Sequence, residues 1–252
     1  MSRWLLFISM LWAFIAAAPV RADTPPTYYF VFEADEARLA ERADDGIDLD
    51  AAMQSALDVA AKRIGKVDHT LERIGERRVA LTLTHENAPQ AARDVFGITG
   101  DLDFLLVDLE PEQADLEQGK APAGTFVLPH PDGHLLLAMR KAGGVSGDHL
   151  IDARAGKDPQ TGQPVITLGF DPEGKEQFAT LTRVSIGKPL AIVLDGKVLS
   201  VPTIQEPILE GQVQISGSFT QESAEQLAIA LRSGALPTPF RLIEERRLEP
   251  VP

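Results

Sequence analysis

The stretch GKPLAIVLDGKVLS, residues 187–200, decides the fold of the second half of the chain. Residues 190–194 are continuously apolar, which predicts a short buried strand. Asp195 and Gly196 come next, and this pair predicts a two-residue hairpin turn because both residues tolerate a positive φ. Apolar and β-branched residues resume over residues 198–204, where Pro202 restricts the second strand to an edge or a bulge. The stretch therefore predicts a hairpin around which the neighbouring elements pack.

The segments on both sides of this hairpin complete an α+β unit. We expect a strand, a helix, a strand and a second helix, at residues 163–170, 172–186, 212–215 and 220–233. Asp171 and Thr220 are suited to cap the N-termini of the two helices. Gly234 ends the last helix, because glycine readily adopts the positive φ of a helix C-terminus.

The first half of the chain predicts a ferredoxin-like unit. Its elements follow the order β-α-β-β-α-β, at about residues 28–33, 50–64, 71–74, 78–84, 88–96 and 102–107. In the ferredoxin-like motif this order places two helices on one face of a four-stranded sheet. Residues 35–48 are rich in charge, and we expect them to be exposed.

Together these patterns predict an α+β protein in which a head subdomain is inserted into a ferredoxin-like base. The expected divisions are a signal peptide, a base, a linker with a hairpin, a head, and a return strand with a tail, at residues 1–22, 23–108, 109–147, 148–237 and 238–252. The linker is rich in Pro, Gly and charge. It ends in a glycine-rich joint at residues 143–147, which we expect to be flexible.

Insertion of the head means that the chain crosses between base and head twice. The divisions above place one crossing near Asp108 and the other near Pro237 and Pro239. Two crossings allow rotation about a line but oppose free tumbling, so they favour a hinge over a tether. We therefore predict hinge positions at Asp108, Pro237 and Pro239.

The N-terminal segment predicts export across a membrane. Arg3 precedes the apolar residues 4–18, and small or apolar residues lead to a cleavage site after Ala22. We expect a cleaved signal peptide and a periplasmic protein. The alternative is an N-terminal anchor in the inner membrane, which Pro19 and the short apolar stretch disfavour. No later stretch is long and apolar enough to span a membrane, and without Cys the chain forms no disulfides.

Charge and missing motifs exclude several classes of function. The chain has 24 Lys and Arg against 37 Asp and Glu, and its net charge of −13 argues against nucleic acid and anionic lipid partners. His130 and His134 are four residues apart, but the Pro and Gly between them break the helix that a zinc pair would need. The acids around Gly46 fail the calcium-loop spacing, and no hydrolase or nucleotide-binding motif is present. We therefore expect no enzyme, no cofactor and no metal, and we assign no catalytic residue.

Six segments of the second half carry a resemblance by their order and spacing. They are DARAG, QTGQPV, GKPLAIVLDGKVLS, EPI, QISGSFT and LRSGALP, at residues 152–156, 160–165, 187–200, 206–208, 214–220 and 231–237. Together they resemble the first large periplasmic domain of the protein-export subunit SecD, in the SecDF family. The base fits that family more loosely. The resemblance implies a base-and-head fold, a head that holds emerging preprotein, and a swing of the head that proton flow through the family's membrane half drives.

This resemblance leads us to expect a non-enzymatic periplasmic protein that binds unfolded or translocating polypeptide as an accessory to protein export. Its partners would be the polypeptide and the export channel. The chain ends about where the family enters its second membrane helix, so we expect no proton-driven movement of its own. The alternative function is that of a structural or regulatory envelope protein that keeps the fold but binds one folded partner.

The expected polypeptide-binding surface is an edge strand that accepts an extended chain by strand addition or apolar contact. Its contact residues would be Val201, Ile204 and Ile208. The alternative is that Pro202 and Pro207 only protect this edge from aggregation.

Overall fold

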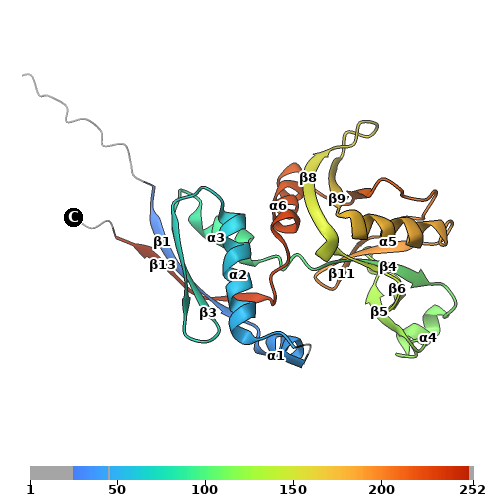
Figure 1. Ribbon diagram of the computed structural model, residues 1–252, viewed down its shortest axis with the longest axis horizontal. Helices are drawn as coiled ribbons and strands as arrows, with labels where there is room; N and C mark the ends of the chain where they lie inside the picture. Colours follow the sequence, from blue (N-terminus) through green and yellow to red (C-terminus); the bar gives the residue numbers. More distant parts are fainter. Residues whose placement is uncertain (1–24, 45, 250–252) are drawn as a thin grey trace, which may run out of the picture.

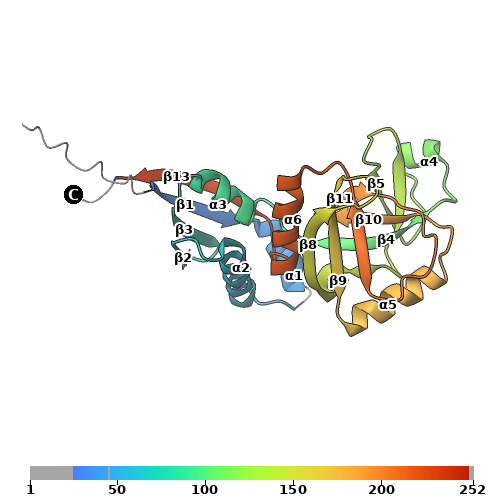
Figure 2. The same cartoon turned by 90° about the horizontal axis from the view of Figure 1, so that it is seen from above.

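The computed structural model describes residues 25–44 and 46–249. The signal peptide predicted at residues 1–22 lies outside the described residues. The fold is α+β, as the sequence predicts, and it consists of two units that lie side by side along the long axis of the molecule (Figure 1). Helix α6 (Gln221–Ser233) lies between the two units in this view and in a view turned by 90° (Figure 2). None of the described helices is long and apolar enough to cross a membrane.

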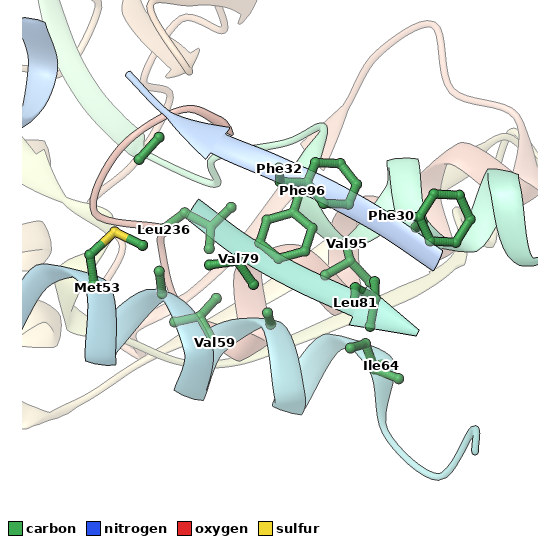
Figure 3. Close-up of a cluster of buried hydrophobic side chains, with 14 of the residues drawn as sticks. Phe30, Phe32, Met53, Val59, Ile64, Val79, Leu81, Val95, Phe96 and Leu236 are labelled. Atoms are coloured by element: carbon green, nitrogen blue, oxygen red, sulfur yellow. The ribbon is translucent and has the colours of Figure 1, made fainter. Parts of the chain in front are cut away.

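The base is a four-stranded antiparallel sheet with helices on one face. The strand order is β13-β1-β3-β2, for β13 (Phe240–Leu248), β1 (Thr27–Ala34), β3 (Arg78–Thr84) and β2 (His69–Ile74). Two helices pack on the sheet, α2 (Leu49–Ile64) and α3 (Ala88–Phe96). Asp48 caps α2 as an extended residue whose carboxylate accepts hydrogen bonds from the first-turn amides. Figure 3 shows the apolar side chains of sheet and helices that meet in this core.

The outer face of the base sheet carries a group of charged side chains. Glu33 of β1 accepts a hydrogen bond from Arg78 of β3 at 2.9 Å and one from Arg241 of β13 at 3.1 Å. These two bonds hold the pKa of Glu33 below its usual value, and the bond from Arg78 has the larger effect. Period-two alternation thus separates the apolar face that the helices cover from an outer face that carries these charged side chains.

A helix occupies part of the charged segment that the sequence predicts to be exposed. Helix α1 (Glu36–Asp44) follows β1 directly, and Leu39 on it is buried in the base core. Leu39 is the single large apolar side chain among these nine residues, beside three alanines and five charged residues, so the charge of the segment predicts exposure where one side chain is buried.

The fourth strand of the base is β13, and the prediction of residues 102–107 for that position is wrong. Strand β4 (Leu102–Asp108) lies in a second sheet, between β10 (Leu190–Leu194) and β6 (Leu136–Arg140). Leu102 and Phe104 enter one apolar cluster, and Leu105 and Val107 enter another on the opposite face. A strand that is apolar on both faces needs a core on each side, which the base sheet with its charged outer face does not offer.

The head contains two sheets. The larger one has the order β11-β10-β4-β6-β5, with β7 (Val145–Ser146) also paired to β4; its edges are β11 (Lys197–Ser200) and β5 (Thr125–Pro129). The smaller one has the order β12-β9-β8, for β12 (Gln212–Ser216), β9 (Pro164–Phe170) and β8 (Leu150–Lys157). The predicted hairpin of residues 187–200 is present, with Asp195 at φ 50° and Gly196 at φ 72°.

Two capped helices complete the main core of the head. In α5 (Pro172–Arg183) the Asp171 carboxylate accepts a hydrogen bond from the backbone N–H of Gly174 at 2.7 Å. In α6 the side chains of Thr220 and Ser223 form a reciprocal capping box. Both N-caps agree with the residues that the sequence predicts. The helices bury their apolar faces against the inner face of the smaller sheet and against β4 and β10.

The segment between β4 and β8 is more ordered than its composition suggests. It contains a short helix, α4 (Gln113–Glu117), with Leu116 buried, and a one-turn 3-10 helix, η1 (Gly147–His149). The glycine joint predicted at residues 143–147 is a packed contact. A Cβ on Gly144 would lie 2.7 Å from the carbonyl oxygen of Phe104, so this glycine permits close approach of two backbones.

Candidate functional site

A pocket of about 270 Å³ opens in the head beside the segment that follows β11, residues 201–211. Its buried lining is apolar and includes Phe104 of β4, Phe178 of α5 and Ile192 of β10. The rings of Phe104 and Phe178 meet edge to face, with centroids 4.9 Å apart. Its exposed lining is polar and consists mainly of Thr203, Gln205, Glu206, Gln212 and Gln214. The pocket therefore offers an apolar interior behind a rim of hydrogen-bonding groups.

Backbone hydrogen bonds hold residues 201–211 against the rest of the head. The N–H of Leu190 donates to the carbonyl oxygen of Pro202 at 2.9 Å, and the N–H of Ile204 donates to that of Lys188 at 3.0 Å. Further along, the N–H of Ile208 donates to the buried Thr182 hydroxyl at 2.9 Å. The segment is thus a fastened loop that forms one wall of the pocket.

The three predicted contact residues occupy different environments. Ile204 and Ile208 both line the pocket, Ile204 with only 6% of its surface exposed and Ile208 half-buried. Val201 instead packs against the cluster on the opposite face of β4 and β10. The structure therefore brings Ile204 and Ile208 together and separates Val201 from them. The aromatic side chains of the pocket come from elements far apart in sequence, so the local patterns around residue 200 do not reveal them.

The junction between base and head is fastened by Arg63, a buried residue of α2. One terminal nitrogen of its guanidinium donates to the carbonyl oxygen of Val95 at 2.8 Å and to that of Ile98; the other donates to those of Thr99 at 2.8 Å and Gly234 at 3.1 Å. These carbonyls belong to α3 and to the two connections between the units, residues 97–101 and 234–239. Burial lowers the pKa of Arg63 to about 10, so it stays protonated at neutral pH.

The head binds the first connection, residues 97–101, through Asp195, which has a positive φ in the β10–β11 turn. Its carboxylate accepts hydrogen bonds from the backbone N–H groups of Thr99, Gly100 and Asp101, each at 2.9 Å. A direct bond joins the two connections, from the N–H of Leu236 to the carbonyl oxygen of Thr99 at 2.8 Å. The first connection is therefore bound on one side by a cation of the base and on the other by an anion of the head.

The predicted hinge residues separate into two groups. Pro237 and Pro239 lie in the second connection, where Leu236 is buried in the base core and Thr238 donates a hydrogen bond to the carbonyl oxygen of Asp35. Asp108 lies at the end of β4, inside the head, and is not part of either connection. Because β4 belongs to the head, the first connection precedes this strand. The predicted hinge position Asp108 therefore lies after the connection and not in it.

Asp103 on β4 has a perturbed carboxyl group. It lies beside the junction and lines a pocket of about 510 Å³ together with Asp195 and Pro237. Burial raises its pKa from 3.8 to about 6, and the neighbouring Asp101 and Asp148 carboxylates add to the effect. No cluster of three or more metal-ligating side chains occurs among the described residues.

The fold defines a class of proteins in which a ferredoxin-like base carries a two-sheet head, inserted before the last base strand. The SecDF P1 head subdomain family matches residues 126–238. SecD of Rickettsia bellii is 36% identical over 218 residues, and SecD of Syntrophobacter fumaroxidans is 37% identical over 213 residues. These matches cover 85% and 79% of this chain but only 41% and 40% of the two relatives, both called protein translocase subunits.

Two solved structures agree with the class. SecDF in its super-membrane-facing form matches 91% of this chain with a TM-score of 0.69 and 29% identity, over 32% of that chain. A second structure, described as that of a membrane component SecDF that enhances protein export, matches at 30% identity with a TM-score of 0.65. This match covers 87% of our chain and the whole of the other. The chain belongs to the SecDF family, and it corresponds to the P1 domain of SecD.

Proposed function

We propose that this chain binds unfolded or translocating polypeptide in the periplasm as an accessory to protein export. The observation that carries the proposal is the head pocket, which combines a buried apolar interior with an exposed polar rim. An unfolded chain presents apolar side chains together with backbone groups that are not paired within the chain, and a pocket of this composition is complementary to both. The relatives, which are named as translocase subunits, support the setting in protein export.

Within this proposal, Ile208 and the pocket face of Ile204 contact an apolar side chain of the polypeptide. Val201 anchors the loop instead, because it packs into the other cluster. Binding rests on contacts of the head and needs no proton gradient. The export channel is the proposed neighbour that delivers the polypeptide.

The second connection is the proposed hinge. Pro237 and Pro239 flank Thr238 there, and rotation of the head about this point would break the Arg63 bond to Gly234. The hinge proposal now excludes Asp108, which is paired within the head sheet.

The hydrogen bonds that hold base and head together also favour a second function, in which the chain binds one folded envelope partner. Arg63 and Asp195 together bind the first connection from both sides, so the two units present one composite surface. Such a surface suits a rigid partner better than a succession of unfolded chains.

The test compares a charge inside the pocket with the same charge beside it. The probe is a reduced, iodoacetamide-alkylated model protein with a fluorescent label, titrated against residues 23–252 in anisotropy measurements. Ile208→Asp should weaken binding at least about tenfold, because a carboxylate would enter an apolar pocket. The matched control is Leu209→Asp, since Leu209 is 49% exposed and does not line the pocket; it should bind as the parent does.

Equal affinity of both variants would contradict the pocket assignment, and no binding by the parent chain would contradict polypeptide binding altogether. Crosslinking in living cells then separates the two functions. Recovery of many secretory precursors supports the first, whereas recovery of a single folded protein supports the second.

A further inference from the structure

The free edge of β12 lies directly beside the head pocket. Among the described strands, β12 is an edge of the smaller sheet and pairs only with β9. The bond from the Phe170 N–H to the Gly211 carbonyl oxygen at 3.0 Å sets the register of this pair. Residues 213 and 215 are therefore the hydrogen-bonded positions facing β9, and the backbone N–H and C=O groups of Gln212, Gln214 and Ser216 point away from the sheet. Within the described part of the chain, these outward groups have no backbone partner.

β12 lacks the protection that other edges carry. The two edges of the base sheet, β13 and β2, contain charged residues, as do β11 and β8 in the head. Charged side chains, prolines and bulges are the usual means of preventing one sheet edge from pairing with another chain. β12 reads Gln-Val-Gln-Ile-Ser, without charge, proline or bulge. β5 and β7 are also uncharged, but β5 ends in Pro129 and β7 has only two residues.

We propose that β12 binds an extended segment of the client polypeptide as an added strand. The outward backbone groups of Gln212 and Gln214 would bond to the backbone of the client, while a side chain of the client enters the pocket that these same two residues help to line. Backbone pairing is independent of sequence, and a pocket beside it adds a preference for an apolar side chain. This inference rests on the proposed function and specifies how the polypeptide is recognised.

A proline at position 214 tests the edge without disturbing the sheet. The N–H of Gln214 points outward, so Gln214→Pro removes a bond to the client and none to β9. Its side chain also donates to the Asp158 carboxylate at 3.1 Å. Gln214→Ala is the matched control, because it loses that contact as well but keeps the backbone N–H. We expect Gln214→Pro to bind a labelled apolar decapeptide at least about tenfold more weakly than Gln214→Ala does, since both variants lack the Gln side chain and differ in the backbone N–H.

A second measurement needs no variant of the protein. The same decapeptide with N-methyl groups on alternate residues keeps its side chains but cannot donate those backbone hydrogen bonds. Strand addition predicts a similar loss of affinity for one of the two methylation registers. This arm decides the proposal even if circular dichroism shows that Gln214→Pro is unfolded.

The outcomes distinguish the two levels of the proposal. If Ile208→Asp abolishes binding while Gln214→Pro and both methylated peptides bind like their controls, strand addition is overturned and polypeptide binding stands. If the unmodified peptide and the unfolded model protein both fail to bind, both proposals are overturned.

Discussion

Base and head bury their sheets in different ways. The base covers one face of its sheet with helices and leaves the other to a network of charges around Glu33. The head places β4 between two apolar clusters, so this strand is covered on both faces. The difference shows that the number of apolar faces on a strand, and not its order in the chain, selects the sheet it joins. β4 precedes the head elements in sequence yet forms the centre of their sheet, whereas β13 follows them and returns to the base.

The largest expected effect comes from a charge in the doubly covered strand. Phe104 is fully buried and contacts both Phe170 and Phe178, so Phe104→Asp should cost about 4 kcal/mol or more and unfold the head. Ile243→Asp on β13, where 40% of the side chain is exposed, should cost less than about 1 kcal/mol. Hydrogen exchange followed by mass spectrometry measures each unit separately. Loss of base protection in Phe104→Asp would show that the two units unfold as one.

An intermediate effect is expected at the junction. Arg63→Met removes the donors for four backbone carbonyls and should destabilise the chain by about 2–3 kcal/mol. Amide exchange should rise specifically in residues 97–101 and 234–236. Arg63→Lys keeps the charge but lacks the planar fork, so it should recover only part of the loss. A variant whose exchange in these two segments matches the parent would mean that Asp195 alone fastens the junction.

The smallest expected effect concerns Asp103, where removal of the charge should stabilise the folded protein at neutral pH. Its pKa rises from 3.8 in the unfolded chain to about 6 in the folded one, so the folded state holds the proton more tightly. The stability of the parent therefore falls as pH rises from about 4 to about 6. Asp103→Asn should be more stable by about 1 kcal/mol at pH 7.5, a value already reduced for partial solvent exposure.

Urea unfolding at pH 3.5 and at pH 7.5 measures this effect. At the lower pH both proteins carry an uncharged side chain at position 103 in the folded state, so the difference between them should disappear. A constant difference at both values would assign the effect to packing and not to ionisation.

Local signals in the sequence predict the elements well and their partners less well. The hairpin at Asp195 and the caps at Asp171 and Thr220 are confirmed, because each depends on a few neighbouring residues. β13 returns to the base sheet as predicted, although the alternation of its residues is imperfect. The place of β4 was missed, since two-faced burial becomes visible only when the strands on both sides are known.

The candidate site shows the same limit. A local pattern of apolar residues and prolines predicts Ile204 and Ile208 as contact residues, and both line the pocket. Arg63 carried no signal: in the sequence it is one of two basic residues that complement the dipole at the end of α2, and its partners lie 32 to 171 residues away. Long-range hydrogen bonds of this kind produce no periodic pattern in the sequence, so the sequence does not predict the role of Arg63 at the junction.

The position of β13 in the base sheet has a consequence for the order in which the chain acquires structure. The head is one continuous segment between α3 and the second connection, whereas the base needs its last strand from the far side of that segment. A chain that emerges from its N-terminus can complete the head first and must leave three base strands unpaired with β13 until that strand is made. Closure of the base sheet joins strands that are far apart in sequence, so it should be the slower folding step. The head can fold before β13 is available to the base.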